Sequence, residues 1–174
     1  MDDNIFVQEC LKGNSKAQKA LFDKFAPKML SVCLRYMKNV EQAEDALQDG
    51  FIKVFRNLKS YKNTGALEGW IRRIVVNSCL DALQKNKKLL LNVQVEEVEY
   101  KLEAEDFTAE KMMADDLMKL VQNMPEGYRV IFNMYAIEGY AHQEIASQLG
   151  ISESTSKTQY LRARAYLQNR IGKR

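Results

Sequence analysis

The chain has 174 residues, of which 46% are hydrophobic and 28% charged, and its formal net charge is +3. This composition is typical of a globular protein of one or two domains. The sequence contains no apolar run of the roughly 18 residues that a membrane span needs, so no membrane insertion is expected. The N-terminal stretch MDDNIF is acidic and polar rather than a signal peptide, which predicts a cytoplasmic protein.

The small net charge hides three blocks of different sign. Residues 1–88 carry sixteen Lys and Arg against ten Asp and Glu, residues 89–124 carry three against nine, and residues 125–174 carry seven against four. Basic blocks favour a polyanionic partner. The acidic block between them is either a solvated linker or a segment that mimics such a polyanion.

The first block has apolar residues at helical spacing throughout. We expect one helix before Pro27, a second after it, a third over residues 40–58 and a fourth over residues 66–88, with a polar loop at residues 60–65. Residues 89–110 show neither a helical nor a strand period, and no hairpin signal occurs in the chain. The predicted fold is therefore all-α, with helical domains at 1–88 and 111–174 joined by an acidic linker at 89–110.

The C-terminal block predicts helices over residues 109–123 and 126–139, followed by a helix-turn-helix in QEIASQLGISESTSKTQYLRARAYL, residues 143–167. Gly150 supplies the left-handed residue that closes the first helix, and Ser152 caps the second. The outer face of the second helix is expected to carry Lys157, Thr158, Gln159, Arg162 and Arg164. Hydroxyls, an amide and cations can meet phosphates and base edges in a major groove, although such helix pairs also occur without DNA.

On the third predicted helix, one outward face mixes acids, an amide and an apolar residue. Its members are Asp45, Gln48, Asp49, Ile52 and Arg56. An apolar side chain ringed by charges is typical of a protein contact, whereas a purely solvated face would more often pair Lys with Glu. A decorative surface remains an alternative, and so does a nuclease site in which Glu44, Asp45 and Asp49 hold Mg²⁺.

On the fourth predicted helix, polar residues line up on one side with a tryptophan in the same sector. They are Arg73, Asn77, Asp81, Gln84 and Lys88, with Trp70. A tryptophan beside cations and amides can stack on a base of a single strand, while the alternative is that it packs under a neighbouring helix. The loop just before it, Lys62, Asn63, Thr64 and Gly65, has a glycine and short side chains that would let the backbone approach a base closely.

Catalytic and metal-binding material is scarce. His142 is the only histidine, which leaves little for a His-based metal site or a Ser–His relay, so a surface or packing role is expected for it. The cysteines Cys10, Cys33 and Cys79 are odd in number and form no CxxC pair, so buried free thiols are expected. We expect no cofactor, no metal and no enzymatic activity.

Three segments together resemble bacterial RNA polymerase sigma factors of the extracytoplasmic-function (ECF) branch, over nearly the whole chain. AEDALQDGFIKVFRNL is similar to region 2.2, which docks on the clamp helices of the polymerase β′ subunit. YKNTGALEGWIRRIVVNSCLDAL is similar to regions 2.3 and 2.4, which open and read the minus-ten element. MPEGYRVIFNMYAIEGYAHQEIASQLGISESTSKTQYLRARAYL is similar to region 4, which reads the minus-thirty-five element as duplex.

The resemblance assigns roles to matching positions of this chain. It implies that the residues that bind core polymerase are Asp45, Gln48, Asp49, Ile52 and Arg56. The residues implied to bind the melted minus-ten strand are Lys62, Asn63, Thr64, Gly65, Trp70, Arg73 and Asn77. Those implied to face the minus-thirty-five groove are Thr155, Lys157, Thr158, Leu161 and Arg162. It implies the β′ and β subunits and promoter DNA as partners, with an anti-sigma factor as a further one. The acidic linker would then thread through polymerase as a mimic of nucleic acid.

The helix-turn-helix departs from the family pattern at three positions. Ser154 replaces a common glycine, Ser156 a branched apolar residue and Gln159 a basic one. These differences affect which promoter sequence is read. The alternative function is a helix-turn-helix regulator that binds duplex operator without polymerase; such proteins usually dimerise, and because no dimerisation heptad is present we expect a monomer when free.

Overall fold

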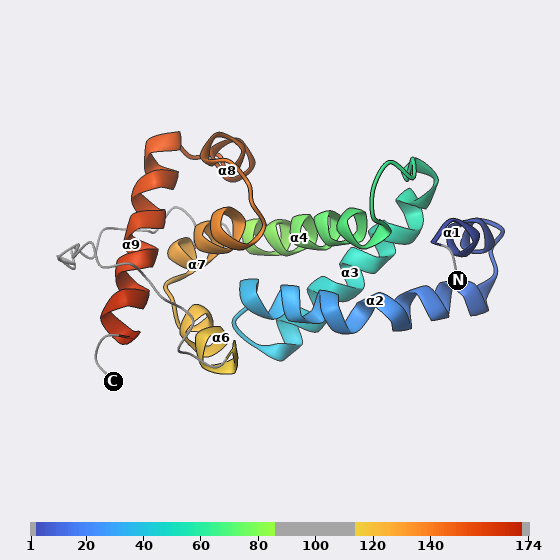
Figure 1. Ribbon diagram of the computed structural model, residues 1–174, viewed down its shortest axis with the longest axis horizontal. Coiled ribbons are helices and arrows are strands. Elements are labelled where there is room, and N and C mark those ends of the chain that lie inside the picture. Colours follow the sequence, from blue (N-terminus) through green and yellow to red (C-terminus); the bar gives the residue numbers. More distant parts are fainter. Residues whose placement is uncertain (1–2, 86–113, 172–174) are drawn as a thin grey trace. The chain divides into compact units, whose positions relative to one another are not determined.

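The computed structural model describes residues 3–85 and 114–171, which form two separate helical units (Figure 1). No strand occurs within these two ranges, and the predicted all-α fold is confirmed. The expected end of the fourth helix at Lys88, the linker at 89–110 and the expected helix start at Ala109 lie outside the described residues.

The first unit contains four α-helices and one short 3₁₀ turn. They are α1 (Asp3–Leu11), α2 (Ser15–Tyr36), α3 (Val40–Asn57), η1 (Leu58–Ser60) and α4 (Leu67–Lys85). Helices α2, α3 and α4 pack on one another, and α1 packs on α2 (Figure 1). Asparagine side chains cap two of the helix starts: Asn14 Oδ1 accepts from the Lys16 amide at 3.1 Å, and Asn39 Oδ1 from the Gln42 amide at 2.9 Å.

The predicted helix break at Pro27 is wrong, because α2 runs through this residue without interruption. Proline lacks an amide proton and strains the preceding turn, which costs a helix interior about 3 kcal/mol or more. Pro27 itself is exposed, while Phe25, Ala26 and Met29 around it are buried. Burial of this apolar stripe offsets the lost hydrogen bond, so tertiary packing overrides the local preference.

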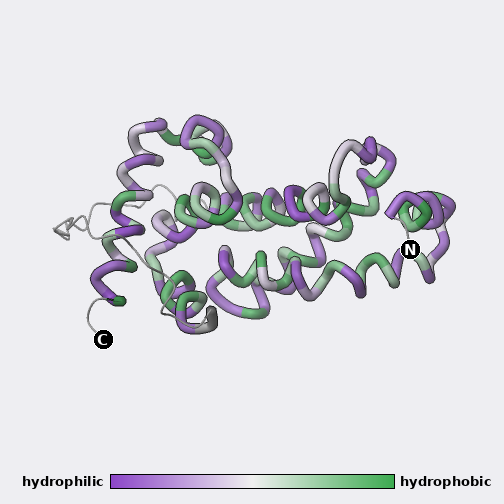
Figure 2. The backbone as a smooth tube through the Cα atoms, in the orientation of Figure 1, coloured by the Kyte–Doolittle hydropathy of each residue, from purple (hydrophilic) through white to green (hydrophobic). Residues whose placement is uncertain are grey.

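The core of the first unit lies between the inward faces of α2, α3 and α4. Its most deeply buried members include Leu21, Met29 and Cys33 of α2, Val54 of α3, and Ile71, Val75 and Cys79 of α4. Figure 2 shows hydrophobic and hydrophilic residues alternating within the turns of these helices, as expected when one side is buried. All three cysteines are free and buried, as predicted.

A glycine in the middle of α3 sets the distance between α3 and α4. A Cβ added at Gly50 would lie 3.0 Å from Val75 Cγ2 and 3.3 Å from Val75 Cα. Such a carbon would press on the backbone of α4 as well as on a side chain. Gly50 therefore lets the two helices approach more closely than any larger residue allows.

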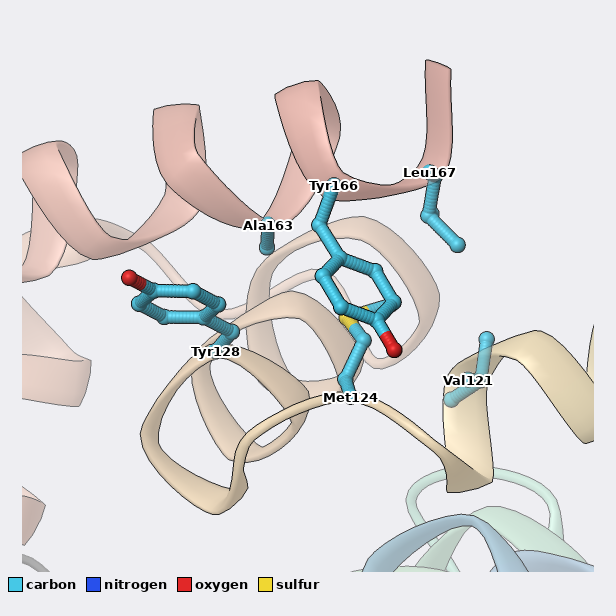
Figure 3. Close-up of a cluster of buried hydrophobic side chains, with 6 residues drawn as sticks. All are labelled: Val121, Met124, Tyr128, Ala163, Tyr166 and Leu167. Carbon is cyan, nitrogen blue, oxygen red and sulfur yellow. The ribbon is translucent and has the colours of Figure 1, made fainter. Parts of the chain in front are cut away.

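Within residues 114–171, the second unit contains five helical segments that form a small bundle. They are α6 (Ala114–Gln122), α7 (Glu126–Phe132), a turn of π-helix, η3 (Asn133–Ile137), α8 (His142–Leu149) and α9 (Glu153–Ile171). Figure 3 shows the core beneath α9, where Ala163, Tyr166 and Leu167 meet Val121, Met124 and Tyr128. The Tyr166 hydroxyl also donates to the Asn123 carbonyl at 2.8 Å, which fixes the end of α6 on α9.

A buried arginine closes the corner between α6 and α7. Arg129 is 1% exposed, and its Nη1 donates to the carbonyls of Gln122 at 3.0 Å and Met124 at 3.4 Å. The two carbonyls belong to the last residue of α6 and to the segment that follows it, so a charged donor stabilises the C-terminal end of this helix. Burial lowers the pKa of Arg129, and the nearby Glu126 partly opposes that shift.

The helix-turn-helix has the local structure that its sequence predicts. Gly150 adopts a left-handed φ of 67°, and the Ile151 amide donates back to the Ala146 carbonyl at 3.1 Å. Ser152 Oγ accepts from the Thr155 amide at 3.0 Å at the start of α9. Both caps are confirmed, and they determine how α9 leaves the turn.

Replacing Gly50 with Ala should destabilise the first unit. Alanine raises helix propensity by about 1 kcal/mol, but overpacking of this kind costs about 1–3 kcal/mol, so we expect a net loss. Gly69→Ala is the matched control, because Gly69 also lies in a helix and an added Cβ would meet nothing within 4 Å. Urea unfolding followed by fluorescence of Trp70, the single tryptophan, measures both. Equal stability of the two variants would contradict the role given to Gly50.

Candidate interfaces for protein and nucleic acid

The face predicted on α3 is exposed along its whole length. Asp45, Gln48, Asp49, Ile52 and Arg56 are all open to solvent, and Ile52 remains 48% exposed. The opposite side of α3 is buried against α2 and α4. The helix therefore presents an exposed apolar side chain, Ile52, among polar ones.

The alternative metal site on α3 finds no support in the geometry. Among the residues that the structure describes, no three His, Cys, Asp or Glu side chains are grouped so that they could hold a metal ion. Glu44, Asp45 and Asp49 are all exposed on α3.

The loop between η1 and α4 is exposed, but it is not free of internal structure. Lys62, Asn63, Thr64 and Gly65 are all open to solvent, and Asn63 has a left-handed φ of 56°. The Tyr61 hydroxyl donates to the Gly65 carbonyl at 2.5 Å and lies 3.2 Å from Asn63 Oδ1. No helical period or motif marks Tyr61 in the sequence, because it lies at the start of the irregular segment YKNTG.

Trp70 is half-buried, and its ring packs on that of Tyr61. The two ring centroids lie 5.5 Å apart, with an angle of 52° between the ring planes. Arg73 and Asn77 are exposed on the following turns of α4, on the side that spacings of three and four residues give to Trp70. Further along α4, Asp81 Oδ2 forms an ion pair with Lys53 Nζ of α3 at 2.7 Å.

The outer face of α9 agrees with the prediction at most positions. Thr155, Lys157, Thr158 and Leu161 are exposed, Leu161 by 45%, and Arg162 is half-buried. Lys157 Nζ forms an ion pair with Glu153 Oε1 one turn earlier, at 2.7 Å.

Gln159, expected on the outer face of α9, instead points inward and is only 7% exposed. Ser156, Gln159 and Ala163 follow one another at intervals of three and four residues and are all buried, so they form part of the inward stripe of the helix. The side-chain oxygen of Gln159 is buried without a hydrogen-bond partner. Because Ser156 and Gln159 are polar, apolar periodicity does not identify them as buried positions.

His142 joins three elements of the second unit. Its Nδ1 lies 2.9 Å from Ser156 Oγ of α9, and its ring stacks on Tyr135 of η3 with 4.1 Å between centroids. Tyr135 in turn lies 4.5 Å from the ring of Tyr160. Burial lowers the pKa of His142, Lys157 lowers it further, and Glu153 partly opposes the shift. The predicted packing role of His142 is confirmed.

Comparisons with known families place both units in one class of protein. The family model of sigma-70 region 2 matches residues 21–89, and that of sigma-70 region 4 matches residues 114–167. The two units, in this order, define a sigma factor of the sigma-70 type.

Similar proteins narrow the class. The ECF RNA polymerase sigma factor SigE of Mycolicibacterium smegmatis is 29% identical over 153 residues, which are 85% of this chain but 59% of that relative. The ECF RNA polymerase sigma-E factor of Escherichia coli is 25% identical over 186 aligned positions, covering 98% of this chain and 95% of the relative. The chain belongs to the ECF sigma factors.

Solved structures agree on the fold. CnrH, in complex with the cytosolic domain of CnrY, matches with a TM-score of 0.52 at 19% identity over 98% of this chain and 97% of its own. The sigma factor RpoE from Bartonella quintana, in complex with the anti-sigma factor NepR, matches with a TM-score of 0.52 at 18% identity, covering 87% of this chain and 94% of that one.

Family membership decides between the functions left open by the sequence. The protein is an alternative sigma factor that directs transcription initiation, and the free-standing helix-turn-helix regulator is not favoured. Sigma factors are non-enzymatic regulators of transcription. In the described parts of the chain, no helix is long and apolar enough to cross a membrane.

The second unit should lose stability as the pH falls below about 6.5. Because the pKa of His142 is lower in the folded state than its ordinary value of 6.5, the unfolded chain binds the proton more tightly. The loss begins at the ordinary value and continues down to the folded pKa; above about pH 6.5 this group contributes no pH dependence. Amide exchange protection factors in α8 and α9 between about pH 7.5 and 5.5 measure the effect, and His142→Gln should flatten the slope. An unchanged slope in that variant would contradict the assignment.

Proposed function

We propose that the two units divide the work of promoter recognition. The first, within residues 1–88, binds core polymerase through α3 and the melted minus-ten strand through α4 and its preceding loop. The second, within residues 111–174, binds the minus-thirty-five duplex through α9. The observation that carries this proposal is that α3 and α9 each present one exposed, chemically distinct face while their other sides are buried.

The face of α3 suits a protein better than DNA. Asp45 and Asp49 would repel phosphates, whereas Ile52 loses contact with water only if another apolar surface covers it. An apolar centre with a polar rim is the usual anatomy of a protein interface. The partner we propose is the pair of clamp helices of the β′ subunit, with Gln48 and Arg56 supplying hydrogen bonds at the rim.

The loop and α4 suit an unpaired strand. Trp70, which is half-buried, lies on the same side of α4 as an exposed cation, Arg73, and an exposed amide, Asn77. Bases stack on aromatic rings, amides bond their edges and arginine holds the backbone. In this proposal the protein captures bases after the duplex separates, so binding energy rather than chemistry drives promoter opening.

The face of α9 suits a major groove. Lys157 and Arg162 provide cations for phosphates, while Thr158 and Leu161 reach toward base edges, where an apolar contact can meet a thymine methyl group. The ion pair between Lys157 and Glu153 is exposed and screened by solvent, so a phosphate can replace the carboxylate at small cost.

Further parts of the proposal follow from the family. Acting on polymerase and chromosome, the protein works in the cytoplasm, without catalytic chemistry or a cofactor of its own. Residues 89–110 connect the two domains as an acidic, nucleic-acid-like segment along polymerase. Both solved relatives were found with a protein partner, CnrY and the anti-sigma factor NepR, which supports an anti-sigma factor for this otherwise monomeric chain as well.

Run-off transcription with core polymerase on pooled genomic promoter fragments tests the proposed function. We expect discrete new start sites sharing two spaced elements, and we expect Ile52→Asp to abolish them by placing a charge in the polymerase contact. Ile5→Asp is the matched control, since Ile5 is 53% exposed on α1, outside the proposed interface. Circular dichroism checks that both variants fold. Normal polymerase binding by Ile52→Asp would show that this face of α3 is assigned wrongly.

Lys157→Ala and Arg162→Ala should weaken binding to the minus-thirty-five duplex while leaving polymerase association intact. Removing one phosphate contact should lower affinity by roughly fivefold and reduce the salt slope by about one. Lys119→Ala, an exposed lysine on α6, serves as the control for general charge loss. Fluorescence anisotropy with labelled duplex and with labelled polymerase separates the two activities. Equal loss of both would refute the proposed division of labour.

A further inference from the structure

The loop before α4 is held between two fixed ends. Tyr61 ends η1 with its amide donating to the Leu58 carbonyl at 3.2 Å, and Leu67 at the start of α4 is fully buried. Between them, residues 62–66 are all exposed. An exposed segment of this length has no core contacts to select one conformation.

A single hydroxyl group supplies the contacts to this loop that the core does not supply. Among the hydrogen bonds of the described residues, the two that cross this loop both involve Tyr61 Oη, at 2.5 Å to the Gly65 carbonyl and 3.2 Å to Asn63 Oδ1. Asn63 is held at a φ of 56°, a left-handed conformation that costs most residues about 1 kcal/mol. The Tyr61 hydroxyl lies against the side chain of this one left-handed residue and the carbonyl of Gly65.

The ring of Tyr61 connects the loop to the proposed base-stacking residue. It packs 5.5 Å from the ring of Trp70, in the first turn of α4. Tyr61 thus contacts the loop through its hydroxyl and Trp70 through its ring.

We propose that Tyr61 is a positioning residue whose hydroxyl holds the Lys62–Gly65 backbone in the conformation that receives an unpaired base beside Trp70. This inference rests on the proposed minus-ten function of the loop. Holding the loop in advance reduces the ordering cost at the moment of binding, which raises affinity without a new contact to the strand. The hydroxyl is the acting group, since a phenylalanine would preserve the ring packing on Trp70.

The Tyr61 hydroxyl bonds to groups at the surface, and this distinguishes the proposed positioning role from a purely structural role. The groups released by Tyr61→Phe, the Gly65 carbonyl and the Asn63 amide, are already exposed and can bond to water. Folding stability should therefore change little. The loss should instead appear when the loop must be ordered around a base.

The test uses full-length protein in complex with core polymerase and a promoter fragment with an unpaired minus-ten region. Tyr61→Phe should weaken binding by about five- to tenfold, the factor that corresponds to one ordinary hydrogen bond. The penalty should vanish when an abasic site replaces the captured base, and it should be absent for a minus-thirty-five duplex alone. The melting temperature should match that of the wild type.

The possible results lead to different conclusions. The same penalty on every abasic strand, or a clearly lowered melting temperature, would mean that Tyr61 acts only on the fold and would overturn the inference. Equal binding by Tyr61→Phe and wild type would overturn it while leaving the proposed function intact. If the wild-type complex binds the unpaired strand no better than Trp70→Ala does, the proposed minus-ten role itself fails, and the inference fails with it.

Discussion

The close contact between α3 and α4 is the constraint on which the first unit depends. At Gly50 the backbone of α3 approaches Val75 with no side chain between them, so the two helices form one rigid pair. The ion pair of Lys53 with Asp81 bridges the same two helices at the surface. The proposed polymerase face on α3 and the proposed single-strand face on α4 then have a fixed relative position. Under the proposed function, binding of the α3 face to polymerase also sets the position of the α4 face.

In the second unit, α9 must pack on the rest of the unit through one side and, under the proposed function, remain accessible to DNA on the other. Its C-terminal half packs through Ala163, Tyr166 and Leu167 on an apolar core. Its N-terminal half is held by polar contacts instead, with Ser156 bonded to His142 and the His142 ring stacked on Tyr135. His142 is thus the residue through which α8 contacts both η3 and α9 in this half.

The helices of the fold could be predicted from the sequence because apolar residues recur at helical spacing and because Gly150 and Ser152 have strong local preferences. The break at Pro27 was wrong because the buried stripe around it outweighs a local penalty, and only the packing reveals this. Ser156 and Gln159 were hidden for the opposite reason, since polar residues on a buried stripe carry no apolar signal. The π-helical turn at Asn133–Ile137 likewise has no signal in apolar periodicity.

The candidate site could be predicted as a set of faces but not as contacts. Exposure of Asp45, Ile52 or Thr158 follows directly from helical period. The role of Tyr61 does not, because its hydroxyl reaches four residues ahead within an irregular loop, where no period links sequence to space. Such a contact becomes visible only when the backbone of Asn63 and Gly65 is known.

Because each proposed DNA contact is weak, promoter recognition depends on joining the contacts in one polymerase complex. The α9 face offers only a few cations, so counterion release gives the second unit limited affinity for DNA alone. Two weak sites joined in one polymerase complex bind a promoter far more tightly than either does, because the second contact forms at high effective concentration. A free sigma factor built in this way leaves ordinary DNA largely uncovered. Recognition then depends on the polymerase that carries both units and on the presence of both promoter elements at the correct spacing.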